Sequence, residues 1–271
     1  MPPRSCPRLR SNSPRPGPPE RLGSQTLADT KQAADQLFAS GEARQGSFRF
    51  DEKVVQVFPD MIARSVPGYE LIVPMIGLLA RRYARPDTRI YDLGCSLGAC
   101  TLAMRAAVTA ERVAYVAVDN APAMIEACRE RLVASGDAPL ELVCKDLRAL
   151  AIENASVVVM NFTLQFVAPA ERAALMRRIA QGMVPGGVLI LAEKVRFENA
   201  LSQRDQTDWH HEFKRAMGYS DLEIAAKRTA LEHVLQPDTH EQHEQRLLAA
   251  GFERVERWFQ CFSFQALIAF R

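Results

Sequence analysis

The sequence has little net charge and contains no long apolar run. Its 34 basic and 32 acidic residues leave a formal net charge of only +2 at pH 7, whereas nucleic-acid-binding surfaces are usually strongly basic. No apolar run approaches the ~20 residues that cross a bilayer, and the arginine-containing N-terminus lacks the apolar core of a secretory signal. We therefore expect a cytoplasmic protein that binds neither nucleic acid nor a membrane.

The six cysteines are never spaced as the C-x-x-C pairs that hold zinc. The five that follow residue 90 lie in or beside expected strands and helices, where reduced, buried thiols are the ordinary outcome. The apolar fraction of 48% and the charged fraction of 24% are typical of a soluble globular enzyme. The sequence therefore predicts no metal site.

The first 45 residues lack the composition of a folded core. They are rich in Pro, Arg, Ser and Gly through Gly23, and such a segment cannot bury enough apolar surface to offset its ordering entropy. We expect residues 1–45 to be a disordered N-terminal extension. An anionic partner for its arginines is the alternative. The folded domain is expected over residues 46–271.

From residue 89 onward, strand and helix patterns alternate along the chain. Short apolar runs near 89–92, 113–119, 140–145, 156–160 and 188–193 are separated by amphipathic helical stretches, which predicts a mostly parallel sheet with helices on both faces. The rhythm breaks after Lys194. Residues 198–235 are polar and helical, as in an insertion or lid, and 252–261 with 264–270 predict an antiparallel hairpin. The expected fold class is α/β, a Rossmann-like sheet.

The central stretch is Arg89-Ile-Tyr-Asp-Leu-Gly-Cys-Ser-Leu-Gly-Ala-Cys-Thr-Leu102. It predicts a strand, a glycine loop and a helix N-terminus, with Gly94 at the tight turn and Gly98 where the helix packs on the strand. Ser96 replaces the middle glycine of the dinucleotide motif and leaves less room for a pyrophosphate. The pattern resembles the loop of class I S-adenosylmethionine (SAM) enzymes. A strand-to-helix turn without a ligand is the alternative.

Polar side chains follow the next three strands, at the edge where ligands bind in such sheets. Asp119 follows the second strand and is expected to accept hydrogen bonds from both ribose hydroxyls, unless it caps the helix that opens at Pro122. Asp146 follows the third strand and suits an adenine amino group, or is a plain turn residue. Asn161 follows the fourth strand and faces the reactive end of the ligand. Together these positions predict SAM binding.

A longer series of motifs resembles one family, the bacterial carboxy-S-adenosyl-L-methionine (carboxy-SAM) synthases. The resemblance runs from about Gly46 to the C-terminus, and its motifs are far more specific than the SAM loop. They are Phe50-Asp-Glu-Lys-Val-Val, Val57-Phe-Pro-Asp-Met-Ile, Ser65-Val-Pro-Gly-Tyr69, Tyr91-Asp-Leu-Gly-Cys-Ser-Leu-Gly-Ala99, Ile152-Glu-Asn-Ala-Ser156, Asn161-Phe-Thr-Leu-Gln-Phe166, His210-His211, Phe213-Lys-Arg-Ala216, Gly218-Tyr-Ser220 and Trp258-Phe-Gln-Cys-Phe262.

The resemblance implies a reaction that the residues alone do not. The family converts SAM and prephenate to carboxy-SAM and phenylpyruvate, and supplies the donor for carboxymethylation of wobble uridine in tRNA. It implies a homodimer that contacts no tRNA and passes its product to a tRNA-modifying enzyme. In the mechanism proposed for the family, prephenate releases carbon dioxide and hydroxide as its ring aromatises. Hydroxide deprotonates the SAM methyl group, and the ylide attacks carbon dioxide.

The resemblance also implies the site residues. The SAM-contacting positions are Tyr69, Gly94, Cys95, Ser96, Asp119, Asn120, Asp146, Leu147 and Asn161. Leu147 replaces an isoleucine that is usual in the family, which a backbone contact tolerates. Arg228 is expected to hold the new carboxylate, because a guanidinium pairs a carboxylate bidentately; without the resemblance it reads as an exposed helix charge. His210 and His211 are adjacent and do not share a helix face, so we expect them to pack or to support the residues that contact the ligand, rather than to bind a metal.

Two other functions remain open at this stage. The first is an ordinary SAM-dependent methyltransferase that acts on a small molecule. The second is a catalytically silent SAM-binding or scaffold protein in a tRNA-modification assembly. The nucleotide that co-purifies with the protein separates the three: carboxy-SAM, plain SAM or S-adenosylhomocysteine, or none.

Overall fold

The computed structural model describes residues 35, 37, 51–133, 135–231 and 234–271. The extension predicted for residues 1–45 therefore lies outside the described residues, apart from Asp35 and Leu37. The boundary at residue 46 stays a prediction. Asp35 is nonetheless buried, with 3% of its surface exposed, and contacts the folded domain.

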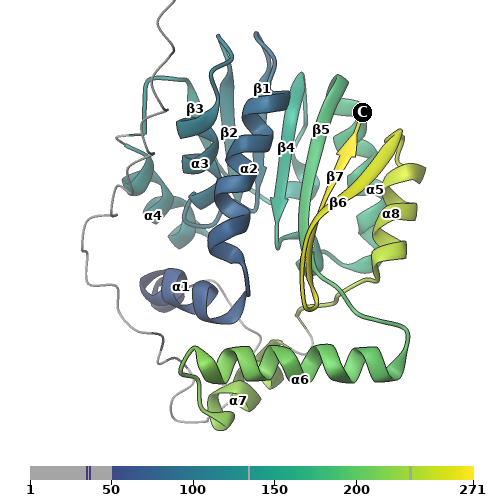
Figure 1. The fold of residues 1–271 in the computed structure, drawn as a ribbon. Helices are drawn as coiled ribbons and strands as arrows, with labels where there is room; N and C mark the ends of the chain where they lie inside the picture. The colour runs from purple at the N-terminus through teal and green to yellow at the C-terminus, as the bar shows by residue number, and fades with distance from the viewer. Residues whose placement is uncertain (1–34, 36, 38–50, 134, 232–233) are drawn as a thin grey trace, which may run out of the picture. The chain divides into compact units, whose positions relative to one another are not determined.

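Seven strands form one sheet in the order β3-β2-β1-β4-β5-β7-β6. The first five strands pair in parallel, and β7 pairs antiparallel with both β5 and β6. This confirms the predicted parallel sheet with a C-terminal hairpin (Figure 1). The strands are β1 (Arg89–Leu93), β2 (Ala114–Asp119), β3 (Leu140–Cys144), β4 (Ala155–Asn161), β5 (Met183–Lys194), β6 (Arg254–Cys261) and β7 (Phe264–Phe270).

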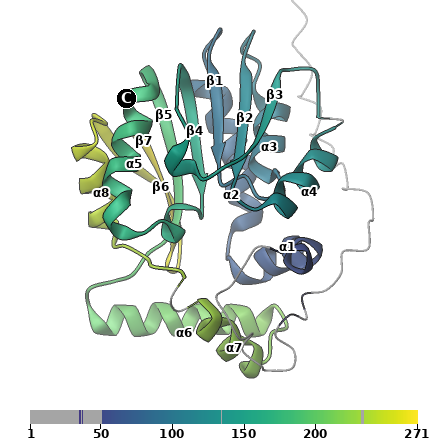
Figure 2. The ribbon, with the colours of Figure 1, turned by 180° about the vertical axis from the view of Figure 1, so that it is seen from behind.

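Helices cover both faces of the sheet because its central strands are apolar on both sides. Every residue of β4 before Asn161 is buried. Residues of α2 (Tyr69–Tyr83) and α3 (Ala99–Ala107) pack on one face, and α4 (Pro122–Leu132) packs against β2 beside them. Residues of α5 (Pro169–Gly182) and α8 (His240–Ala249) pack on the other face (Figure 2). The order reverses between β1 and β4, which is where such sheets bind ligands.

Three further helices lie beyond the carboxyl ends of the parallel strands (Figures 1 and 2). Asp51 caps α1 (Glu52–Ser65), as predicted, by accepting hydrogen bonds from two backbone amides. Asn199 caps α6 (Ala200–Ala216) in the same way, and α7 (Asp221–Leu231) follows it. Helices α6 and α7 both fall within the insertion predicted at 198–235, and we call α1, α6 and α7 the cap.

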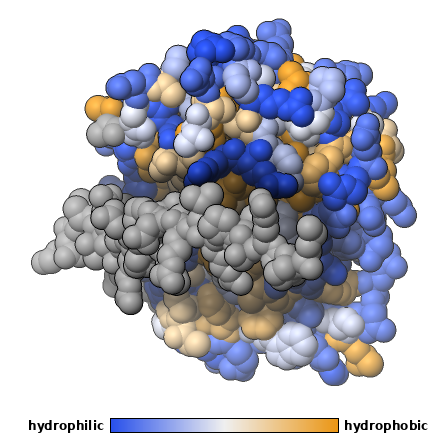
Figure 3. All heavy atoms as spheres, turned by 45° about the horizontal axis from the view of Figure 1, so that its top comes forward, coloured by the Kyte–Doolittle hydropathy of each residue, from blue (hydrophilic) through white to orange (hydrophobic). Residues whose placement is uncertain are grey.

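The opposite edge of the sheet differs in character. In Figure 3, which tilts that edge toward the viewer, hydrophilic side chains form most of the upper rim. Within the described parts of the chain, no single helix is long and apolar enough to cross a membrane. Helices α1 and α2 together reach that length and composition, but they are bent by 97° where they meet.

Candidate functional site

A cavity of about 510 Å³ lies at the carboxyl ends of the strands, between the sheet and the cap. This volume is ordinary for a site that holds a cofactor-sized molecule. The cavity is lined by residues of β1, β2, β4 and β5 and by residues of all three cap helices. All nine positions expected to contact SAM line it, namely Tyr69, Gly94, Cys95, Ser96, Asp119, Asn120, Asp146, Leu147 and Asn161.

The loop after β1 is shaped by its two glycines. Gly94 has φ +82°, and a Cβ there would lie 2.3 Å from Thr163 Oγ1. Gly98 has φ +80°, and its Cβ would lie 2.8 Å from Cys128 Sγ. The close contact at Gly98 is thus with helix α4 and not with the strand. A side chain at either position would displace the loop, so both positions require glycine to keep this loop conformation.

Asp119 fixes this loop and faces the cavity. Its two carboxylate oxygens accept hydrogen bonds from the backbone amides of Ser96, at 3.0 Å, and Ala121, at 2.9 Å. The residue at the cap position of α4 is Ala121. Asp119 is therefore not the N-cap of this helix, which was its alternative role in the sequence analysis. Burial raises its pKa, partly offset by the backbone donors. Each oxygen keeps a second lone pair, which suits a pair of ribose hydroxyls.

Asp146 serves as a turn residue and as a wall of the cavity. It caps the single helical turn Leu147–Ala149, and its carboxylate accepts from the Arg148 guanidinium at 2.9 Å through Nε. That guanidinium holds the pKa of Asp146 below its usual range. The turn role is therefore seen. The adenine contact stays a prediction.

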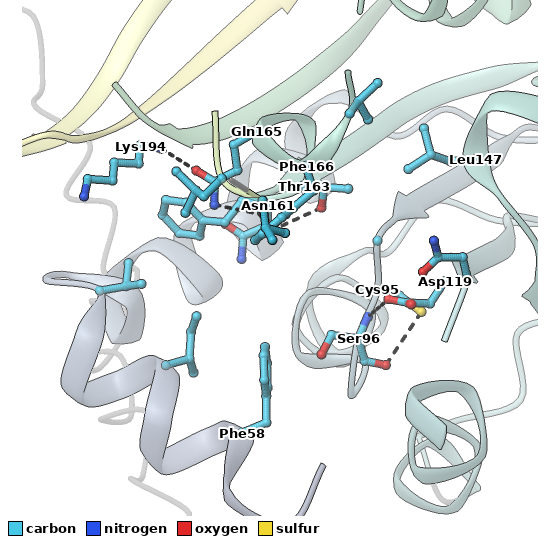
Figure 4. Close-up of a pocket in the computed structure, with 18 of the residues that line it drawn as sticks. Phe58, Cys95, Ser96, Asp119, Leu147, Asn161, Thr163, Gln165, Phe166 and Lys194 are labelled. Atoms are coloured by element: carbon cyan, nitrogen blue, oxygen red, sulfur yellow. Dashed lines mark hydrogen bonds between the residues drawn. The ribbon is translucent and has the colours of Figure 1, made fainter. Parts of the chain in front are cut away.

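Asn161 stands between the two ends of the cavity (Figure 4). Its side-chain Oδ1 is buried without a hydrogen-bond partner in the described part of the chain. A buried acceptor without a donor is costly, so a donor from a bound molecule fits this position. Tyr69, at the start of α2, lies beside it, with its ring centroid 6.4 Å from that of Phe162.

The sequence reasoning missed a set of basic residues at the other end of the cavity. Lys194, Lys214 and Lys227 line it and come from β5, α6 and α7. Figure 4 shows Lys194 on the far side of Asn161 from Asp119. One signal was present: Lys194 ends a buried strand, the same position that identified Asp119 and Asn161.

Arg228 and His210 occupy different positions relative to the cavity. Arg228 does not line the cavity; it is exposed on α7, in a small depression with residues such as His211 and Asp221. His210 does line the cavity, and its Nε2 lies 2.8 Å from the carbonyl oxygen of Ser65. Burial lowers the His210 pKa to about 2, so the ring is neutral.

Over the described ranges, no three His, Cys, Asp or Glu residues form a group that could hold a metal ion.

Solved structures share this fold. A putative O-methyltransferase from Nostoc punctiforme superposes with a TM-score of 0.59 at 14% identity, over 87% of this chain and 66% of that one. Human N-acetylserotonin methyltransferase in complex with SAM superposes with a TM-score of 0.54 at 16% identity, over 81% of this chain and 55% of that one. At such low identity these likenesses show the SAM-methyltransferase fold.

The sequence comparisons are more specific. Residues 90–187 match the family model of a methyltransferase domain. The carboxy-SAM synthase of Salmonella paratyphi C is 54% identical over 238 residues, which are 88% of this chain and 96% of that protein. The synthases of Geobacter sp. and Trichlorobacter lovleyi are 52% and 56% identical, over 88% and 83% of this chain and 98% and 93% of theirs. The chain therefore belongs to the carboxy-S-adenosyl-L-methionine synthase family.

Proposed function

We propose that the protein converts SAM and prephenate to carboxy-SAM and phenylpyruvate. It is a transferase that acts on SAM. The observation that carries the proposal is identity of 52–56% to named carboxy-SAM synthases over more than nine-tenths of their length. The cavity agrees, because one end suits a nucleoside and the other end is lined with lysines.

The reaction balances without an external oxidant or base. In prephenate, the bond from the ring to its carboxylate breaks and the ring hydroxyl leaves as hydroxide, so the ring becomes aromatic. Hydroxide takes one proton from the SAM methyl group and becomes water. The methyl carbon keeps the electron pair and forms a new bond to carbon dioxide. The products are carboxy-SAM, phenylpyruvate and water.

The cavity walls suit these steps. Phe162, Phe264 and Val66 line the cavity and are buried apolar side chains. Apolar walls exclude water, which would otherwise disperse hydroxide and carbon dioxide before they react. In this account Asp119 and Asn161 orient SAM. Neither needs to act as a base, because the substrate supplies the hydroxide.

We further propose that the protein works as a homodimer in which Arg228 holds the new carboxylate in the cavity of a second copy. In its own chain the Arg228 side chain is exposed and outside the cavity, and the structure gives it no ion pair with a described residue. An exposed, unpaired guanidinium is available to a neighbouring molecule. Arg228→Ala should lose affinity for carboxy-SAM by about 2–5 kcal/mol and affinity for SAM much less.

Mixing two inactive variants tests this arrangement. Asp119→Ala removes the nucleotide contact and Arg228→Ala removes the carboxylate contact. If Arg228 acts in a partner's cavity, mixed dimers regain one complete site, and activity rises well above that of either variant alone. No recovery after subunit exchange, or an Arg228→Ala protein that binds both nucleotides normally, contradicts the proposal.

In the cell, we propose that the protein acts in the cytoplasm and passes carboxy-SAM to a tRNA-modifying enzyme. The protein itself should not bind tRNA, because its net charge is only +2. A filter-binding assay at low salt checks this. Tight binding that weakens steeply with added salt would contradict it.

The second candidate is a SAM-dependent methyltransferase for small molecules, favoured by the methyltransferase domain match at residues 90–187. The nucleotide bound to freshly purified protein separates the candidates by mass spectrometry. Carboxy-SAM supports the synthase. SAM or S-adenosylhomocysteine supports the methyltransferase, and protein without nucleotide favours a silent binding protein.

A further inference from the structure

The lysine-lined end of the cavity has more positive charge than its surroundings neutralise. Lys214 is buried, with 8% of its surface exposed, and neither its ammonium group nor that of Lys194 has a hydrogen-bond acceptor or an ion-pair partner among the residues that the structure describes. The Lys194 ammonium lies 5.8 Å from the centroid of the Phe264 ring, and its nearest charged neighbours, Lys214 and Arg228, are also cations. Lys194 is half-buried, and charges withdrawn from bulk water are normally paired, so both ammonium groups can accept an anionic ligand in the cavity.

Lys227 differs from the other two because protein groups hold it. Its Nζ donates to Ser65 Oγ at 2.8 Å and to the Tyr219 hydroxyl at 3.3 Å, and lies 3.5 Å from a carboxylate oxygen of Asp35. Asp35 thus offsets one of the three positive charges. Two uncompensated ammonium groups, Lys194 and Lys214, remain facing the cavity. Burial and the neighbouring lysines lower the pKa of Lys214 to about 7, so a bound anion is needed to keep its ammonium group fully charged near neutral pH.

The ligand chemistry follows from this arrangement. SAM bears a sulfonium and an ammonium against one carboxylate, so its net positive charge does not neutralise two lysines. A dicarboxylate brings two negative charges and leaves the pocket nearly balanced. Resting on the proposed function, we propose that Lys194 and Lys214 form the subsite that binds the two carboxylates of the second substrate, and that Lys227 positions the cap around them.

The subsite also explains why a dicarboxylate binds beside SAM. The two lysines repel the sulfonium when the subsite is empty, and a bound dianion removes that repulsion. SAM and the dicarboxylate should therefore bind with positive cooperativity. The cationic end also disfavours neutral methyl acceptors, since they would leave both lysines unpaired.

Neutral substitution of each lysine tests the subsite. Lys214→Met and Lys194→Met keep side-chain length and remove the charge, and Lys53→Met, an exposed position on α1, is the matched control. Calorimetry with prephenate and protein loaded with S-adenosylhomocysteine measures binding without turnover, because that nucleotide has no methyl group to carboxylate. Each cavity variant should lose roughly ten- to a hundredfold in prephenate affinity. Affinity for SAM should not fall, and should rise modestly because one charge that repels the sulfonium is gone; the control should bind normally.

Thermal unfolding provides an independent readout. Removing an unpaired buried charge relieves a cost in the ligand-free protein, so Lys214→Met should unfold at a higher temperature than the wild type. A lysine with a purely structural role would lower it. Lys214→Arg keeps the charge and should restore part of the prephenate affinity.

The possible results separate this inference from the proposed function. Prephenate affinity that is unchanged in both lysine variants overturns the subsite. A loss of SAM affinity as large as the loss of prephenate affinity also overturns it, because the lysines would then bind the carboxylate of SAM. Lysine-dependent prephenate binding without any carboxy-SAM production supports the subsite and contradicts the proposed function.

Discussion

At the scale of single residues, Asp119 is the side chain that we expect to bind the ribose of SAM. Asp119→Ala should weaken SAM binding by roughly ten- to a hundredfold, because it removes the acceptor for two ribose hydroxyls and frees the Ser96 amide. Calorimetry measures the affinity, and Asp137→Ala, an exposed acidic position, is the matched control. An unchanged dissociation constant in the folded Asp119→Ala protein would remove this residue from the site.

Lys214 makes substrate binding depend on pH. Its pKa is lowered to about 7 by burial and by the charges of Lys227 and Lys194. Burial lowers the pKa of Lys227 to about 8, and it lowers that of Lys194 as well. His210 is neutral throughout this range. A dicarboxylate binds the protonated lysine, so prephenate affinity should fall above pH 7, by at most about tenfold per pH unit for one proton.

The measurement is the KM for prephenate between pH 6.5 and pH 9, with both prephenate carboxylates ionised throughout the range. Lys214→Arg is the control, because a guanidinium stays charged and should flatten the profile. The same lowered pKa means that the unfolded chain binds more protons than the folded one between about pH 7 and 10.4, so ligand-free stability should rise with pH there. A wild-type KM that does not change with pH contradicts the assignment of Lys214.

At the scale of elements, hydrogen bonds hold the cap in place. The Tyr219 hydroxyl donates to Asp35 at 2.5 Å, and its ring lies under the Arg64 guanidinium, 4.0 Å from its centroid. Tyr219→Phe keeps the ring and removes the donor to a buried carboxylate, which should cost about 1–3 kcal/mol of unfolding free energy. Urea denaturation measures it. Tyr83→Phe, whose hydroxyl has only a 3.4 Å contact with Arg82, should cost much less. Equal losses in both variants would count against the cap contact.

The elements themselves followed well from local patterns. Asp51 was recognised as a helix cap because capping chemistry lies within a few residues of the helix start. The alternation of apolar strands and amphipathic helices predicted the parallel sheet because central strands such as β4 are buried on both faces. The start of β5 could not be predicted correctly. The turn residues Pro185-Gly-Gly187 predicted that the preceding helix ends there, but β5 already begins at Met183.

At the scale of the whole molecule, the sequence predicted one end of the site better than the other. Asp119 and Asn161 were found because the carboxyl ends of parallel strands meet at one edge of the sheet. Lys214 was not found because its burial depends on how α6 packs over that edge. Lys227 and Arg228 show the same limit: neighbours on a helix point about 100° apart. No local pattern tells which of the two faces the cavity.

The central claim is that this chain makes carboxy-SAM from prephenate, and product analysis tests it most directly. Purified protein is incubated with SAM and with prephenate that carries an isotope label in its ring carboxylate, and the nucleotides are analysed by mass spectrometry. We predict a nucleotide in which one hydrogen of the SAM methyl group is replaced by a labelled carboxyl group, with an equal amount of phenylpyruvate. Unchanged SAM, or a carboxylated product without the label, would contradict the account.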